Sequence, residues 1–515
     1  MWVVGSWCFR CPAKPAGYSV KFDIDTYAAE AEQFVTAIDR EYYLHFAGLK
    51  AEFEIAPIYE QHAGLFEQGI VEQLRDELAA AEPGDSERRH RYLLQLAIDG
   101  FIGEQTKAQT TELAERESTL KIQWPGGEEP YRQAAIVQAN EPDSARRFEI
   151  ERARNAVLQA ELNPLYLEIH ERGHQLAEEL GWRSYRAMCE ELKQVDFEML
   201  AAQTRAFKES TDADYRDLTE PQLVAETSIG FDRLRRSDFP YFFRAKTHDS
   251  LFPSERLVEA LESTLSGLGF DLKEQPNITL DLEQRPNKSP RAFCSPVRVP
   301  NEVYLVIAPR GGRDDFAALF HEAGHTEHYA NVDPDLPFEF RYLGDNSVTE
   351  GFAFLFEHLT ENSTWLEFAL GRPATDSYLE YVRASKLIFL RRYAVKLEYE
   401  LALHTGQKPL AEMPELYARL LSEAAGVDWP EVSYLADVDD GFYVANYLRA
   451  WALETTLRSI LEERFGPKWF VDAQAGELLR SIWREGQRLS ADELLAQLGE
   501  GPLDFTVMID EVAGS

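Results

Sequence analysis

The sequence has few cysteines, no long hydrophobic run and no recognisable secretory signal. Four cysteines in 515 residues are too few and too scattered for a disulfide framework, and the pair Cys8 and Cys11 lacks a second CxxC to complete a zinc knuckle. No apolar run approaches the roughly 18 residues of a membrane span. The first residues lack a basic stretch followed by a long apolar one. We therefore expect a cytoplasmic protein with no membrane partner.

Basic residues are also scarce relative to acidic ones. The chain has 53 Lys and Arg against 89 Asp and Glu, which gives a formal net charge of −36. Such a surface repels phosphate backbones and anionic lipid heads, so nucleic acid is not expected as a partner. The acidity fits either simple solubility or an acidic cleft that favours cationic peptides. Hydrophobic residues make up 44% of the chain, which is enough for a large core and argues against disorder.

Apolar periodicity of the helical kind dominates the chain. We expect a loose lead-in over residues 1–20, a helical lobe over 21–270 and a catalytic domain over 271–515. Only one region has the short β-branched and aromatic segments of a sheet, between Asn277 and Ala308. In the first half, helices are predicted over Tyr27–Leu49, Phe66–Ala81, Ser86–Leu120, Tyr131–Glu161, Leu165–Leu180, Arg183–Lys208 and Glu220–Arg235.

One motif outweighs the rest of the sequence. His321-Glu322-Ala-Gly-His325 is an HExxH pattern, and it follows Asp314 and Asp315, which suit the positive end of a helix dipole. Residues four apart lie on one face of a helix, so both imidazoles can reach one ion. Glu322 lies one position on, where it can take a proton from an attacking water. Two histidines and a carboxylate with one open position are the usual catalytic zinc arrangement, so we expect one Zn²⁺ per chain.

A third protein ligand is required, and Glu350 is the best candidate. It lies near the start of the next predicted helix, Asn346–Leu359, where a thermolysin-like site would place its glutamate. Glu357 follows about two turns later on the same face. Carboxylates behind ligating histidines fix their tautomer, and we assign that role to Glu357, with a surface charge as the alternative interpretation.

These residues resemble the thimet oligopeptidase, neurolysin and oligoendopeptidase F group of gluzincin metallopeptidases. The family motif HExGHxxH is matched by His321–His328, and the family's two later glutamates are matched by Glu350 and Glu357. Arg291–Ser295 is similar to the family's edge strand, and Leu180–Tyr185 to a segment of its helical lobe. The resemblance covers about residues 165–465 and is most specific at the motif.

The resemblance implies a fold and a substrate class. The fold would be mostly α, with two helical lobes around a deep substrate channel and a small β-sheet next to the HExxH helix. Such a channel admits short unstructured peptides and excludes folded proteins. Ala292, Phe293 and Cys294 would then line the cleft and pair with the substrate backbone.

The chain departs from the family pattern on a late helix. The family carries there a histidine and tyrosines that hydrogen-bond the tetrahedral intermediate, whereas here Asp437 replaces the histidine and no histidine follows His404. Tyr443 and Tyr447 fit the tyrosine pattern and share one helix face, although both are also compatible with core aromatics. Arg449 lies close by in the sequence and could bind substrate.

The sequence thus predicts a zinc metallopeptidase in which Glu322 is the general base and acid, with Tyr443 and Tyr447 as further catalytic residues. Two alternatives remain open. A carboxypeptidase of similar helical build would need a cation for the substrate's C-terminal carboxylate, and Arg449 could serve. A catalytically silent peptide-binding protein could also keep the zinc. Neither a nucleotide-binding motif nor a nucleophile–histidine pair competes with this interpretation.

Overall fold

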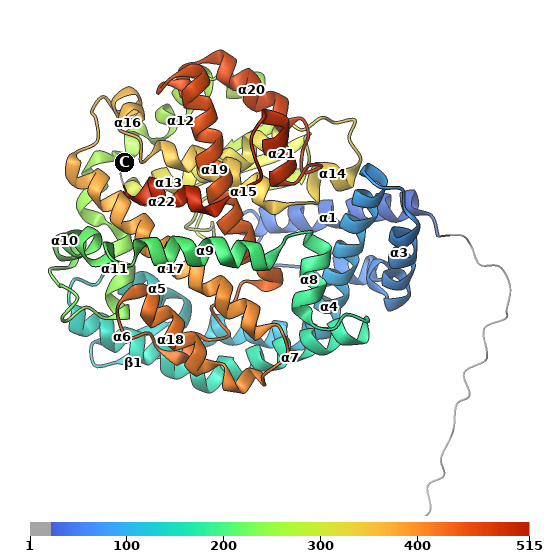
Figure 1. Cartoon of the computed structure of the whole chain (residues 1–515), viewed down its shortest axis with the longest axis horizontal. Coiled ribbons are helices and arrows are strands. Elements are labelled where there is room, and N and C mark those ends of the chain that lie inside the picture. The colour runs from blue at the N-terminus through green and yellow to red at the C-terminus, as the bar shows by residue number, and fades with distance from the viewer. Residues whose placement is uncertain (1–21, 514–515) are drawn as a thin grey trace, which may run out of the picture.

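A computed structural model describes residues 22–513, which are mostly helical with two small sheets (Figure 1). The mostly α prediction is therefore confirmed. The predicted lead-in over residues 1–20, with Cys8 and Cys11, lies outside the described residues. Across residues 22–513 no helix is long and apolar enough to cross a membrane.

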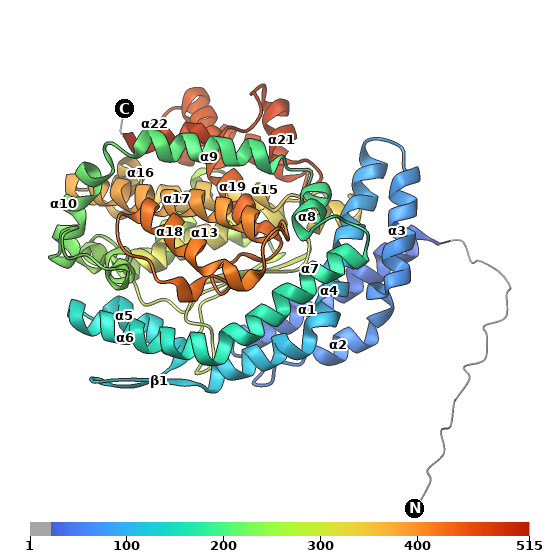
Figure 2. The ribbon, with the colours of Figure 1, turned by 60° about the horizontal axis from the view of Figure 1, so that its bottom comes forward.

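The first part of the chain is helical, as its apolar periodicity predicts. Figure 2 shows these helices, in blue and cyan, curving along one side and one end of the molecule. They are α1 (Ile24–Phe46), α2 (Ala56–Gln61), α3 (Gln68–Ala80), α4 (Asp85–Thr119), α5 (Tyr131–Asn140), α6 (Ser144–Val157) and α7 (Asn163–Glu179).

Two of the predicted helices are divided by local breaks. The helix predicted over 131–161 is interrupted at Pro142, because proline lacks the backbone donor and its ring disfavours helical geometry in the residue before it. The helix predicted over 183–208 ends at Gln194, whose φ is +54°, and restarts when Asp196 accepts from Met199 N at 2.9 Å. The elements that follow are α8 (Tyr185–Lys193), α9 (Phe197–Thr211), α10 (Tyr215–Thr227), α11 (Phe239–Arg244) and α12 (Leu257–Gly267).

The expectation of a single sheet region is wrong. Strands β1 (Lys121–Trp124) and β2 (Gly127–Pro130) form an antiparallel hairpin in a segment whose prolines and glycines indicate only a turn. The hairpin is stabilised by the burial of Ile122 against α5 and α6. That contact joins residues distant in sequence, and β2 itself has no β-forming residues.

The second sheet lies where the sequence predicts it. It contains β3 (Ile278–Asp281), β4 (Phe293–Arg298) and β5 (Glu302–Val306), in the order β3-β5-β4. The middle strand β5 pairs parallel with β3 and antiparallel with β4. Strand β4 is therefore an edge of the sheet, and it packs against both α1 and the helix that follows the sheet.

After the sheet the chain is helical almost to its end. The long helix α17 packs against α9, α10, α18 and α19 (Figure 2), and its burial on several faces is expected for a helix without one apolar stripe. The elements are α13 (Arg313–Ala330), α14 (Phe338–Tyr342), α15 (Asn346–Leu359), α16 (Ser363–Leu370), α17 (Asp376–Leu403), α18 (Pro414–Ala425), α19 (Tyr443–Phe465), α20 (Ala473–Trp483), α21 (Ala491–Leu498) and α22 (Met508–Ala513).

Glycines allow α13, α15 and α19 to approach closely. A Cβ on Gly324 of α13 would lie 2.6 Å from the Cα of Ala353 on α15, and one on Gly351 would lie 2.7 Å from a methyl of Leu453 on α19. These three helices belong to the main apolar core, which includes residues from both sides of residue 270. The division into 21–270 and 271–515 stays a prediction.

Candidate metal centre

Two neighbouring helices bring the predicted ligands together. His321 and His325 lie on α13 and Glu350 on α15, and one ligand atom from each lies within 4.8 Å of the others. Glu350 Oε2 is 3.5 Å from His321 Nε2 and 3.7 Å from His325 Nε2. Ligands about 2 Å from a tetrahedral ion lie roughly 3.3 Å apart. The observed spacing is close to that value.

The carboxylate of Glu350 provides a test of whether these residues fit a cation. Its Oε1 accepts a hydrogen bond from Tyr443 Oη at 2.7 Å, whereas Oε2 is buried and has no hydrogen-bond donor. A buried carboxylate oxygen without a partner is costly. A cation facing Oε2 and the two imidazole Nε2 atoms would satisfy it, so the donor set fits a zinc ion.

The outward nitrogens of both histidines have partners that orient the rings. His321 Nδ1 donates to Glu357 Oε2 at 2.9 Å, and His325 Nδ1 lies within hydrogen-bond distance, 2.8 Å, of Thr349 Oγ1. Both contacts orient the rings so that Nε2 faces Glu350. The structure thus brings Glu357 to the position where sequence analysis expected a supporting carboxylate.

The charges of this group respond to burial and to each other. Burial disfavours the imidazolium of His321, but the nearby carboxylates of Glu350 and Glu357 outweigh burial and raise the pKa of His321 well above its usual value. Burial lowers the pKa of His325 to about 4. For Glu350, burial is outweighed by the two histidines, and its pKa falls. Without an ion, Glu350 is therefore ionised and His325 neutral, the forms that bind metals, whereas His321 is protonated and must lose that proton when a metal binds.

Glu322 lies beside the ligands but does not join them. Its Oε2 accepts from the backbone N–H of Cys294 at 2.8 Å, which ties the motif helix to strand β4. Burial raises the pKa of the Glu322 carboxyl to about 7. A carboxyl with a pKa near neutrality can both take and return a proton.

Strand β4 lies beside this group, as the edge-strand prediction requires. It pairs with β5 on one side only, and the N–H of Cys294 points away from that partner to Glu322. Ala292 is buried just before the strand, while Phe293 and Cys294 are partly exposed. The edge is therefore close to the histidines.

Tyr443 and Tyr447 begin α19 and differ in their contacts. The Tyr443 hydroxyl donates to Glu350, so this residue supports a ligand rather than pointing freely into solvent. Tyr447 packs on it with ring centroids 4.9 Å apart and lines a cavity of about 410 Å³ beside His321.

Aromatic rings form a large part of the lining of this cavity. Its volume is in the range of small-molecule or side-chain pockets. Charged groups also line it, with Lys386 Nζ 3.1 Å from Glu361. The aromatic lining residues are Phe243, Phe354, Phe389, Tyr393, Tyr447 and Trp451.

Arg449 does not line the cavity beside His321, and its contacts argue against the substrate role expected from the sequence. Its side chain is buried, and its Nη2 donates to Asp345 at 3.1 Å and to Asp492 at 2.9 Å. Arg449 is two residues after Tyr447, so the two side chains point in directions about 200° apart around the helix axis. The guanidinium therefore stabilises the junction of α15, α19 and α21.

Asp437, which replaces the family's histidine, is also engaged elsewhere. It forms an ion pair with Arg392 and accepts from Tyr417 Oη at 2.8 Å. These partners hold its side chain in place. Burial would raise the pKa of Asp437, but the partners outweigh burial and lower it. Asp437 is a charged anchor between α17 and α18 and offers no donor to the histidine group.

Sequence reasoning missed Thr349 and the closeness of the helices. Thr349 directly precedes Glu350, so the predicted ligand could have drawn attention to it. Which residue contacts His325, however, depends on how α15 is rotated about its own axis. The Gly324 within the motif was a usable signal for close helix packing.

No family model matches the chain, and no curated protein matches it.

Proposed function

We propose that this protein is a zinc-dependent peptidase that cleaves short unstructured peptides. His321, His325 and Glu350 would hold the ion. The observation that carries the proposal is the unpartnered, buried Glu350 Oε2 facing two imidazole Nε2 atoms. Such a group is costly to keep unless it binds a cation.

The reaction is hydrolysis of a peptide bond without a covalent intermediate. Zinc at this group supplies Lewis acidity toward the scissile carbonyl and lowers the pKa of a water. Glu322 accepts the proton of the attacking water and later donates it to the leaving amine. The N–H of Cys294 holds the Glu322 carboxylate in place, while Glu357 and Thr349 keep the imidazoles oriented.

Substrate binding follows from two features next to Glu322. Strand β4 has an outer edge along which a peptide backbone can pair as an added strand. The aromatic cavity beside His321 suits a large apolar or aromatic side chain of that peptide. Tyr447, which lines this cavity, is the tyrosine placed to contact bound substrate. We also propose the gluzincin-like arrangement of two helical lobes around a deep channel.

The carboxypeptidase alternative is weakened by the contacts of Arg449. That cation is already bound by Asp345 and Asp492, so it is not free to grip a C-terminal carboxylate. Amidation of the C-terminus of a test peptide separates the two activities. An endopeptidase still cleaves the amidated peptide, whereas a carboxypeptidase no longer cleaves it.

The test is cleavage of a mixed library of short peptides, followed by mass spectrometry, for the wild type and Glu322→Gln. We expect internal cleavage by the wild type and a loss of several orders of magnitude in the variant, because the proton acceptor is gone. Equal cleavage by both would reject the mechanism. No cleavage by either, with zinc bound, would favour a silent peptide-binding protein.

A further inference from the structure

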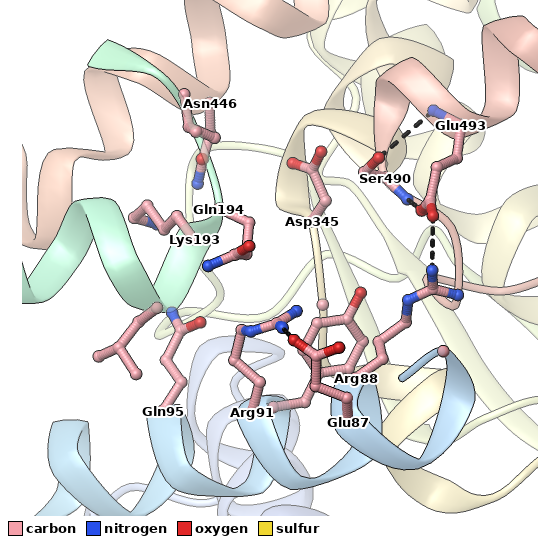
Figure 3. Close-up of a pocket in the computed structure, with 15 residues that line it drawn as sticks. Glu87, Arg88, Arg91, Gln95, Lys193, Gln194, Asp345, Asn446, Ser490 and Glu493 are labelled. Carbon is pink, nitrogen blue, oxygen red and sulfur yellow. Dashed lines mark hydrogen bonds and ion pairs between the residues drawn. The ribbon is translucent and has the colours of Figure 1, made fainter. Parts of the chain in front are cut away.

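A second cavity, of about 340 Å³, lies apart from the metal group. It is bounded by α4, the end of α8, the start of α15 and parts of α19 and α21 (Figure 3). It shares no lining residue with the aromatic cavity beside His321. Its lining is predominantly polar, and Figure 3 shows side chains converging on it from both halves of the chain.

The deepest carboxylate in this cavity is already saturated. Asp345 Oδ1 accepts from Ser347 N at 2.9 Å, while Oδ2 accepts from Ala491 N at 3.0 Å and from Arg449 at 3.1 Å. Burial alone would raise the pKa of Asp345, but the charge of Arg449 and the hydrogen bonds outweigh burial and lower that pKa. Asp345 therefore has little capacity to bind a cationic or donor ligand.

Two further acidic groups in the lining are paired with arginines. Arg88 donates to Glu493 at 2.6 Å and to Asp85 at 3.2 Å, and Arg91 forms an ion pair with Glu87. Each arginine uses only part of its fork in these contacts, because a guanidinium carries five N–H donors. Each arginine can therefore donate hydrogen bonds to a ligand while it neutralises the carboxylate with which it is paired.

The unsatisfied groups of the cavity are donors. Asn446 is 3% exposed, and its Nδ2 has no hydrogen-bond partner. Figure 3 shows this side chain extending from α19 toward Gln194. Lys193, at the end of α8, forms no ion pair with any residue between 22 and 513. A buried amide without a partner calls for an explanation, and an acceptor in the cavity supplies one.

We propose that this cavity binds a small oxyanion, the phosphate or carboxylate group of a soluble molecule. Lys193 provides a positive charge that has no direct ion pair, although the carboxyl of Asp99 acts on it from further away. Asn446 provides a buried donor and Arg91 a planar guanidinium. The volume is at the lower end of small-molecule sites, which suits a compact ligand. This site is independent of the metal centre and of the proposed peptidase activity.

The test is isothermal titration of the metal-loaded full chain with inorganic phosphate and, in a separate arm, with succinate. Ionic strength is kept constant with sodium chloride. We expect saturable binding of at least one probe at one site per chain, and the probe that binds shows whether the ligand group is phosphoryl or carboxylate. Lys193→Gln and Asn446→Asp are expected to weaken it at least about ten-fold, the usual effect of losing a hydrogen bond to a charged group.

Two controls keep the result interpretable. Lys107→Gln, a partly exposed lysine on α4 outside the cavity, should bind like the wild type. His325→Gln should also keep binding, because it alters only the metal centre. The proposal is overturned if neither probe binds saturably, if binding survives in both Lys193→Gln and Asn446→Asp, or if it is lost only in His325→Gln. Lys193 is partly exposed, at the end of α8, so its variant remains informative even if Asn446→Asp unfolds.

Discussion

The hydroxyl of Tyr443 donates a 2.7 Å hydrogen bond to Oε1 of Glu350 and leaves Oε2 facing the two histidines. One tyrosine at the start of α19 thus fixes which carboxylate oxygen is available to an ion. The same contact joins α19 to α15, the two helices that meet at Gly351. The orientation of the third ligand depends on this pairing.

Tyr443→Phe is therefore expected to weaken zinc binding about ten-fold, because groups that orient ligands typically contribute 10- to 100-fold. The measurement is competition with a chelator of known affinity. Tyr447→Phe is the matched control, because its ring packs edge-on against that of Tyr443 but its hydroxyl has no hydrogen bond to Glu350. Equal zinc affinity in Tyr443→Phe and the wild type would show that the hydrogen bond does not orient the carboxylate.

Glu357→Gln should lower zinc affinity by a similar factor, about 10- to 100-fold. The substitution keeps the shape but removes the charge that faces His321 Nδ1 at 2.9 Å. Glu367→Gln, an exposed glutamate on α16, controls for the change in net charge. If both variants bind zinc alike, the contact between Glu357 and His321 has no role in holding the metal.

The local parts of the site could be predicted from the sequence, and the long-range parts could not. The spacing of His321 and His325, and the helix that carries Glu350, follow from periodicity within a few turns of one helix. The contacts of Arg449 could not be predicted in this way, because Asp492 approaches Arg449 only when α21 packs on α19. The hairpin at Ile122 was missed for a related reason, since its stability comes from burial against α5 and α6.

Gly324→Ala should destabilise the fold by about 1–3 kcal/mol, the usual cost of overpacking. The added Cβ would meet the backbone of Ala353 at 2.6 Å and push α13 away from α15. Urea unfolding of the variant gives the free energy. Gly103→Ala is the control, because nothing lies within 4 Å of a Cβ there, and a helical glycine replaced by alanine gains about 0.5–1 kcal/mol. A neutral Gly324→Ala would mean that the helices can separate without cost.

A cluster of buried and partly buried histidines predicts acid sensitivity. His174 Nε2 lies 2.8 Å from His404 Nδ1. Burial lowers the pKa of His170 and His174 to about 4, and that of His404 well below its usual value. The unfolded chain, with pKa values near 6.5, binds more protons below that pH, so this contribution to stability is present above pH 6.5 and is lost as the pH falls toward 4.

His174→Gln should make the free energy of unfolding depend less steeply on pH in that window, by at most about 1.4 kcal/mol per pH unit. Urea unfolding at several pH values gives both slopes. Buried carboxyls such as Glu327, whose pKa burial raises to about 7, act in the opposite direction, so the difference between variant and wild type is the quantity to compare. Identical slopes would show that the cluster is already protonated or solvated in the folded state.

The most direct test of the account is the zinc content of the purified chain after dialysis, measured by inductively coupled plasma mass spectrometry. The wild type and Glu322→Gln should hold about one zinc ion per chain, because Glu322 is not a ligand. His325→Ala and Glu350→Ala should hold almost none, while circular dichroism shows that both remain folded. Full zinc content in folded Glu350→Ala would contradict the central claim that this carboxylate and the two histidines form one metal centre.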